Sequence, residues 1–119
     1  MLTLLLTPLT LFSCSKNKQY ISISPQEAKT IIDTENDYII LDVRTVEEYN
    51  SGHIPNAILI PNEEIKQKAE SILKNKNQLI LVYCRSGRRS KQAASVLVSL
   101  GYTNIKEFGG IIDWPYEIE

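Results

Sequence analysis

Few residues in this chain can ligate a metal or form a disulfide. The 119 residues include two cysteines, Cys14 and Cys84, and one histidine, His53. Two cysteines do not make a disulfide framework, and no Cys/His cluster has the spacing of a metal site. The Gly-x-Gly-x-x-Gly and Walker A patterns are absent, and the formal net charge is −1. The sequence therefore predicts no metal or other cofactor and no general affinity for nucleic acid.

Long apolar runs are also scarce, and the most apolar one stands at the N-terminus. Met1–Phe12 is too short to span a bilayer as a mature helix. It has the character of a secretory signal, and Leu11-Phe12-Ser13-Cys14 resembles the lipobox of bacterial lipoproteins, whose cysteine is lipidated. With the polar tether that follows, residues 1–19 are expected to export the protein to the bacterial cell envelope and anchor it to the membrane through Cys14. The alternative is an apolar N-terminus without a targeting role, on a cytoplasmic protein.

Residues 20–119 alternate between strand and helix patterns, and 43% apolar content suits one soluble domain. Two capping boxes, Ser24-Pro25-Gln26-Glu27 and Thr45-Val46-Glu47-Glu48, predict helix starts, and Gly109–Gly110 predicts a turn. Apolar or alternating runs predict strands at Tyr20–Ile23, Tyr38–Leu41, Leu79–Cys84 and Asn104–Phe108. Strands that alternate with helices indicate a small three-layer α/β domain, with a mainly parallel central sheet flanked by helices.

The stretch from Leu79 to Ser90 carries the strongest chemical signal. It begins as the continuous apolar run of a buried strand and then places Cys84 and three arginines before a helical pattern. Ligands bind at the carboxyl ends of such strands, and a helix N-terminus adds free N–H groups and a positive dipole end. These features and the arginine charges favour the thiolate, so Cys84 is expected to be a nucleophile. The plainer interpretation is a small buried apolar residue at a strand end.

A second group of candidates follows the predicted strand Tyr38–Leu41. Asp42 is expected to accept hydrogen bonds from a neighbouring loop, and Arg44 to pair with Glu47 or Glu48, in supporting roles. His53 is a possible general base, but a preformed thiolate needs none, so a structural turn is favoured. Trp114 is expected to be a packing residue.

Three blocks of the sequence resemble the rhodanese-like sulfurtransferases. The first is Cys84-Arg85-Ser86-Gly87-Arg88-Arg89-Ser90, which resembles the active-site loop of that family. The others are Leu41–Tyr49 followed by Gly52–Ala57, and Phe108-Gly109-Gly110-Ile111 with Trp114. They occur in the family's order and cover about residues 20 to 115. The resemblance implies the rhodanese fold and a transfer of sulfane sulfur.

The resemblance also implies roles for individual residues. Cys84 would take sulfur from a small anionic donor such as thiosulfate and hold it as a persulfide. Cyanide or a thiol, including a protein thiol, would accept it. Backbone N–H groups of the loop would form an anion-binding nest, with Gly87 permitting the tight turn. The expected substrate-binding residues are Arg85, Ser86, Gly87, Arg88 and Arg89, while Asp42 and Arg44 brace the site.

Two other classes of function stay open at this point. Cysteine-based phosphatases and arsenate reductases also combine a cysteine and an arginine in an anion-binding loop. Their loop has one residue more between the two than the four that separate Cys84 from Arg89. The third class is a rhodanese-like interaction module without catalysis. Such modules commonly lack the cysteine, which this chain has.

Overall fold

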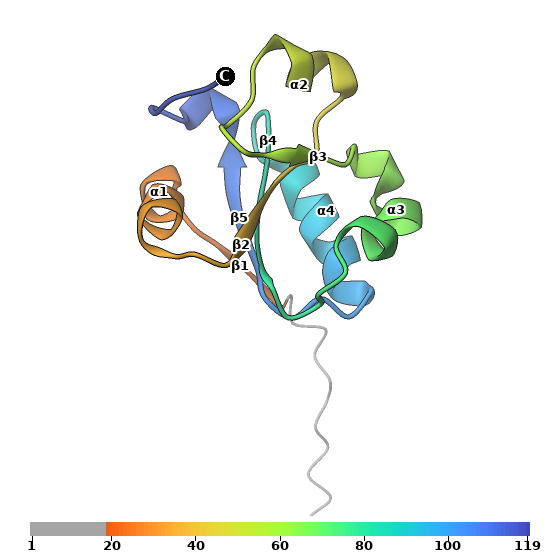
Figure 1. Ribbon diagram of the computed structural model, residues 1–119. Coiled ribbons are helices and arrows are strands. Elements are labelled where there is room, and N and C mark those ends of the chain that lie inside the picture. The colour runs from red at the N-terminus through yellow and green to blue at the C-terminus, as the bar shows by residue number, and fades with distance from the viewer. Residues whose placement is uncertain (1–18) are drawn as a thin grey trace, which may run out of the picture.

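The computed structural model describes residues 19–119 as a five-stranded sheet with helices on both faces (Figure 1). The strand order is β1-β5-β4-β2-β3, and every pairing is parallel. The strands are β1 (Tyr20–Ser22), β2 (Tyr38–Asp42), β3 (Ile58–Leu59), β4 (Leu79–Cys84) and β5 (Ile105–Gly110). The parallel α/β class predicted from the sequence is confirmed.

The helices form the two outer layers. They are α1 (Pro25–Thr34), α2 (Val46–Ser51), α3 (Ile65–Ile72) and α4 (Arg88–Ser99), with short 3-10 turns at Asn62–Glu64 and Ile111–Asp113. Figure 1 shows α1 on one face of the sheet and α3 and α4 on the other. Each face has its own core, one containing Ala28 of α1 and the other Ala69 of α3 and Ala94 of α4. The three-layer prediction is therefore confirmed.

Strand β4 lies in the middle of the sheet and is buried on both sides. Alternate side chains of a strand point to opposite faces. Ile80, Val82 and Cys84 accordingly belong to the core under α3 and α4, whereas Leu81 and Tyr83 belong to the core under α1. This register brings the sulfur of Cys84 to the face that α4 covers, at the carboxyl edge of the sheet.

Both predicted capping boxes are present. The Ser24 hydroxyl accepts from the Glu27 N–H at 3.0 Å, and the Glu27 carboxylate accepts from the Ser24 N–H at 3.1 Å. Thr45 and Glu48 make the same reciprocal bonds at 3.2 and 3.1 Å. Each box satisfies two N–H groups that a helix start leaves free, so the boxes fix where α1 and α2 begin.

The turn predicted at Gly109–Gly110 is wrong, because both glycines belong to β5. Along β4 the register advances two residues from Val82 to Cys84, while β5 advances from Glu107 to Gly110. The extra residue forms a bulge, and Gly109 adopts φ +81°, which glycine tolerates without the penalty of a side chain. A local turn conformation thus occurs inside a strand.

The predicted signal segment and the lipidation site Cys14 lie outside the described residues, and they stay predictions. Within residues 19–119, no helix has both the length and the apolar character needed to cross a membrane.

Candidate active site

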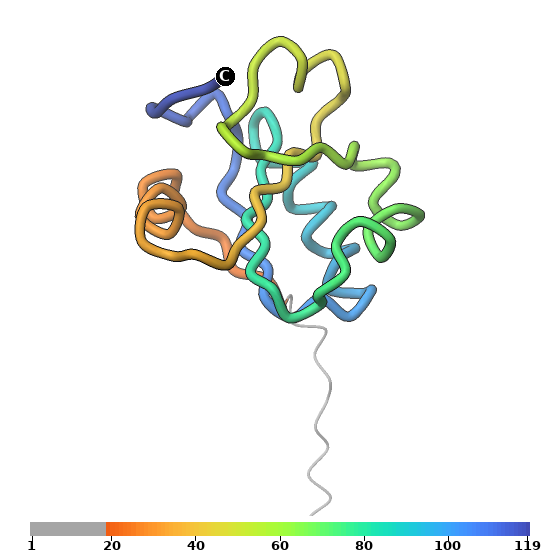
Figure 2. Tube along the Cα trace, viewed as in Figure 1, coloured from red at the N-terminus to blue at the C-terminus, as the bar shows by residue number. Residues whose placement is uncertain are grey.

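Cys84 is the last residue of β4, and its side chain is buried, with the residue 1% exposed. Three residues connect it to α4, which begins at Arg88. Figure 2 shows how tightly the chain turns between the two elements. Gly87 makes this turn possible because it adopts φ +113°, a left-handed conformation that residues with a Cβ rarely take. The sulfur therefore lies directly before the first turn of α4.

The Sγ atom of Cys84 has three polar neighbours. The backbone N–H of Gly87 donates to it at 3.0 Å. The thiol in turn donates to the Ser90 Oγ at 3.4 Å and approaches the Gly109 carbonyl oxygen at 3.7 Å. One amide of the predicted nest thus reaches the sulfur, and it comes from the helix start, where the backbone dipoles favour negative charge.

Ser90 and Glu107 form a buried network behind the sulfur that the sequence analysis missed. Ser90 is fully buried, and its hydroxyl lies 2.8 Å from Glu107 Oε1. Glu107 is 1% exposed and also accepts from the Ser22 hydroxyl at 2.8 Å and the Gly109 N–H at 2.7 Å. The sequence did contain a signal for this network. Glu107 lies two residues after Ile105 in a strand pattern, so its carboxylate is on the same buried face as Ile105. Such a charge is tolerated when it is fully hydrogen-bonded.

The end of β5 supports the loop from another side. A Cβ on Gly110 would lie 1.8 Å from the carbonyl oxygen of Arg85, so only glycine fits there. The same carbonyl accepts from the Ile112 N–H at 3.2 Å. The paired glycines therefore act by allowing the backbone of β5 to contact the Cys84 loop.

Asp42 and Arg44 form a buried pair with each other, not with the helix that follows. Arg44 Nη2 donates to Asp42 Oδ2 at 2.7 Å, and the residues are 5% and 0% exposed. The predicted pairing of Arg44 with Glu47 or Glu48 is wrong. Both groups lie at the same strand end, as the sequence indicated, but the sequence pattern did not reveal that they pair with each other.

Tyr83 joins this pair from the neighbouring strand. Its hydroxyl donates to Asp42 Oδ2 at 2.7 Å and accepts from the Ile54 N–H at 3.1 Å. Burial and the hydrogen bond to Asp42 raise the pKa of Tyr83 well above its ordinary value. Burial is the largest single influence on the pKa of Arg44 and lowers it, but the hydrogen bonds and negative charge of Asp42, with Tyr83, together raise that pKa above its ordinary value. The predicted supporting residues thus tie β2, β4 and the loop before β3 together.

The three arginines of the loop have different surroundings. Arg85 and Arg88 are exposed, as is Ser86. Arg89 makes two bonds to the carboxylate of Glu48, at 2.7 and 3.0 Å. The pair raises the pKa of Arg89, chiefly through the hydrogen bonds to Glu48. Glu48 was predicted as a helix-capping residue and as a partner of Arg44, and its bond to Arg89 was missed.

His53 takes the structural role that the sequence favoured. Its ring stacks on Tyr49 at 3.8 Å between centroids, and Nδ1 lies 3.0 Å from the Tyr49 carbonyl oxygen. Its backbone exchanges hydrogen bonds with Glu119 at 2.9 and 2.8 Å. These contacts hold the C-terminal segment against the turn that follows α2.

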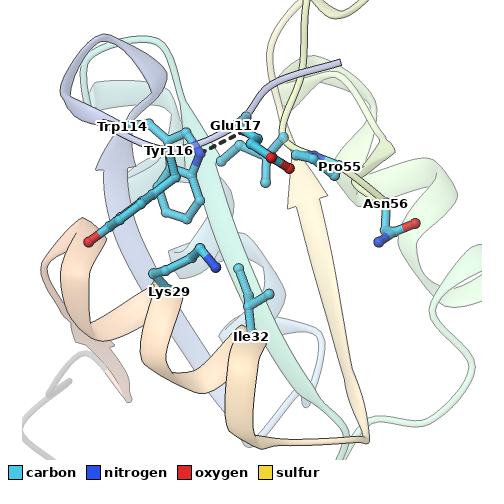
Figure 3. Close-up of a pocket in the computed structure, with 8 residues that line it drawn as sticks. Lys29, Ile32, Pro55, Asn56, Trp114, Tyr116 and Glu117 are labelled. Carbon is cyan, nitrogen blue, oxygen red and sulfur yellow. Dashed lines mark hydrogen bonds between the residues drawn. The ribbon is translucent and has the colours of Figure 1, made fainter.

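Two of the cavities in the described residues have similar volumes. One, about 380 Å³, adjoins the Cys84 loop and is lined by Arg44, Glu48, Ser51, Gly52, Arg85, Ile111, Ile112 and Ile118. The other, about 390 Å³, lies between α1 and the C-terminal segment, where Figure 3 shows Lys29, Trp114 and Tyr116 around it. Trp114 also packs on Phe108 at 5.5 Å between ring centroids, so its predicted packing role is confirmed.

These features together define a class of protein. A buried thiol at the end of a central parallel strand faces a backbone N–H and a helix start, and exposed arginines flank it. Among residues 19–119 there is no group of three or more His, Cys, Asp or Glu side chains that could hold a metal ion. The site is that of an α/β protein with a buried cysteine beside a helix start and exposed arginines.

Comparison with known proteins identifies the family. The model of the Rhodanese-like domain matches residues 24–115, and this chain belongs to that family. It is 40% identical over 73 residues to the thiosulfate sulfurtransferase PspE of Escherichia coli, covering 61% of this chain and 70% of that protein. It is 38% identical over 88 residues to a sulfurtransferase of Allochromatium vinosum, covering 73% and 79%.

One further relative is named as a sulfur carrier, and two solved structures confirm the fold. The putative sulfur carrier protein YrkF of Bacillus subtilis is 37% identical over 98 residues, which cover 82% of this chain and 52% of that protein. A solved rhodanese-like domain from Anabaena is similar at a TM-score of 0.77 with 31% identity, covering 82% of this chain and 77% of that one. A structure of rhodanese with anions from E. coli gives a TM-score of 0.65 with 35% identity, covering 69% and 96%.

Proposed function

We propose that this protein moves a sulfane sulfur from a small anionic donor such as thiosulfate to a thiophilic acceptor, through a persulfide on Cys84. The observation that carries the proposal is the Gly87 N–H, which donates to Cys84 Sγ at 3.0 Å from the start of α4. A hydrogen bond to a charged sulfur is stronger than one to a neutral thiol, so this N–H is placed to assist a reaction in which the sulfur carries negative charge. Membership of a family that includes a thiosulfate sulfurtransferase supports the proposal.

Loading of Cys84 is a displacement at sulfur. The thiolate attacks the outer sulfur of thiosulfate, and a new bond forms between Sγ and that sulfur. The bond between the two sulfurs of thiosulfate breaks, and its electron pair leaves with sulfite. Charge is conserved, because the thiolate becomes a persulfide anion and the thiosulfate dianion is replaced by the sulfite dianion. No metal, oxidant or separate base enters the step.

The surrounding residues would assist in distinct ways. The amide of Gly87 and the start of α4 can stabilise the negative charge that the thiolate carries before the attack and the persulfide carries after it. Arg85 and Arg88 are exposed, so they can attract the anionic donor and release sulfite into solvent. Arg89 already binds Glu48, so it contributes positive charge to the site while it holds α2 against α4.

The main rival is a cysteine-based phosphatase or arsenate reductase. Cys84 is 1% exposed and the loop from it to α4 is short, which suits one added sulfur atom better than a tetrahedral oxyanion. The experiment compares two reactions of the same full-length protein in a Cys14→Ser background. We expect thiocyanate from thiosulfate plus cyanide and no hydrolysis of an aryl phosphate. Cys84→Ser should abolish the first reaction, and aryl phosphate hydrolysis without thiocyanate would support the rival.

Targeting is proposed separately, from the sequence before the domain. The Met1–Phe12 run and the lipobox-like Leu11-Phe12-Ser13-Cys14 support export and lipid attachment at Cys14. Stable attachment would need more than one acyl chain. Cell fractionation with a labelled fatty acid tests this, and we expect label in the membrane fraction that Cys14→Ser removes. Unlabelled protein of full length in the cytoplasm would contradict it.

A further inference from the structure

The cavity beside the Cys84 loop has an apolar side formed by Ile111, Ile112 and Ile118, called here the isoleucine wall. The wall adjoins the loop directly, because the Ile112 N–H donates to the carbonyl oxygen of Arg85 at 3.2 Å. Arg85 is the residue after Cys84 and lines the same cavity. The wall therefore borders the Cys84 loop at Arg85.

Two members of the wall are exposed to solvent. Ile112 is 61% exposed and Ile118 is 56% exposed. Backbone hydrogen bonds hold both segments in place. The Ile112 N–H donates to the Arg85 carbonyl oxygen, and Glu119, directly after Ile118, exchanges backbone hydrogen bonds with His53. Apolar surface that is fixed in place next to a reactive group marks an interaction site. Thiosulfate, sulfite and cyanide are small and polar, and they gain nothing from it.

Two of the three charged residues that line this cavity are paired with a residue of opposite charge. Arg44 is paired with Asp42, and Glu48 is paired with Arg89. Among residues 19–119, Arg85 makes no salt bridge. The lining of this cavity thus combines apolar area with one uncompensated positive charge, that of Arg85. A partner that complements this cavity carries an apolar side chain and a carboxylate close to its own reacting atom.

We propose that the acceptor of the Cys84 sulfur is the cysteine of another protein, flanked by an apolar residue that packs on the isoleucine wall and an acidic residue that pairs with Arg85. The proposal rests on the proposed function and names its second substrate. The acceptor thiolate attacks the terminal sulfur of the Cys84 persulfide. A sulfur–sulfur bond forms to the acceptor, the bond to Sγ breaks, and its electron pair restores the Cys84 thiolate. The acceptor leaves as a persulfide anion, and no oxidant or reductant is used.

The test uses the full-length protein in the Cys14→Ser background and two capped peptides. One has the order Leu-Cys-Leu-Glu, and the other replaces both leucines by serine. Transfer is followed by peptide mass after the protein has been loaded with thiosulfate. We expect kcat/KM to be about tenfold higher for the leucine peptide, and the advantage to depend on the wall. A third peptide with glutamine for glutamate should react more slowly, and added salt should remove that difference.

Matched variants separate the wall from general effects. The double variant Ile112→Ser, Ile118→Ser should lower kcat/KM for the leucine peptide about tenfold and leave the serine peptide and cyanide within twofold. Ile21→Ser is the control, because Ile21 is 58% exposed on the edge strand β1 and does not line this cavity. Equal rates for the two peptides, or equal loss in the control, would overturn the proposal. If no persulfide or thiocyanate forms at all, the proposed function fails instead.

Discussion

Arg89 and Glu48 form a two-bonded ion pair between α4 and α2, with N–O distances of 2.7 and 3.0 Å. The side chains are 23% and 27% exposed, so solvent screens the pair only partly. Hydrogen bonding to Arg89 lowers the pKa of Glu48 from 4.5 to about 2. Because Arg89 lies in the first turn of α4, directly after the Cys84 loop, the pair fixes the helix start on which the sulfur depends.

The ion pair should make stability depend on pH. The folded pKa of Glu48, about 2, lies below its ordinary value of 4.5, so the stabilisation is present above pH 4.5 and is lost as pH falls towards 2. Glu48→Gln should lower the free energy of unfolding by about 1 kcal/mol at pH 7. The difference from the parent should shrink between pH 4.5 and pH 2 in urea titrations. The exposed neighbour Glu47→Gln is the control, and a difference that does not change with pH contradicts the account.

The exposed Arg85 and the paired Arg89 should respond differently to substitution. Arg85→Ala should raise KM for thiosulfate about tenfold and leave the free energy of unfolding nearly unchanged, because the side chain has no ion pair with any of residues 19–119 to lose. Arg89→Ala should raise KM and also destabilise the fold. Steady-state kinetics and urea unfolding of both variants measure this. An unchanged KM with a collapsed turnover for Arg85→Ala would mean that the residue acts only in the transition state.

Gly110 should tolerate no side chain. Its Cβ would lie 1.8 Å from the Arg85 carbonyl oxygen, and backbone on both sides must shift to make room. We expect Gly110→Ala to lower the free energy of unfolding by about 3 kcal/mol and to abolish activity. Gly109→Ala is the control. No atom lies within 4 Å of its Cβ position, so only the φ of +81° is unfavourable, at about 1 kcal/mol. Equal stability of the two variants would refute the close contact.

The buried pair of Asp42 and Arg44 should matter far more than an exposed pair. Asp42→Ala leaves the guanidinium of Arg44, in a residue 5% exposed, without its carboxylate. We expect a loss of about 3–5 kcal/mol in the free energy of unfolding. Asp33→Ala breaks the exposed pair with Lys29 and should change stability by less than about 1 kcal/mol. Similar losses in the two variants would show that the buried pair is not a structural brace.

The sequence predicted the elements whose signals are local. The capping boxes at Ser24 and Thr45, the buried β4 strand and the helix after Cys84 depend on neighbouring residues, and the structure confirms them. The contacts that support the loop depend on register between distant strands. Glu107 meets Ser90 across 17 positions, which no local pattern encodes. The prediction that Arg44 pairs with Glu47 or Glu48 was wrong, because Arg44 pairs with Asp42 at the same strand end. Glu48 of α2 pairs with Arg89 instead.

The bulge in β5 shows a second limit of local patterns. Two adjacent glycines are typical of a turn, and Gly109 does adopt a turn-like φ. The strand nevertheless continues, since Gly110 pairs with Cys84 in the sheet. The glycines are required by the close approach of the Arg85 backbone, a constraint that comes from the packed structure and not from the segment itself.

The most direct test is the intact mass of the protein after treatment with thiosulfate. The measurement uses the full chain with Cys14→Ser, so that Cys84 is its one cysteine. The account predicts that the mass increases by one sulfur atom, that cyanide restores the original mass and releases thiocyanate, and that Cys84→Ser gains no sulfur. A protein that binds anions but never gains sulfur on Cys84 would contradict the account and favour a non-catalytic interaction module.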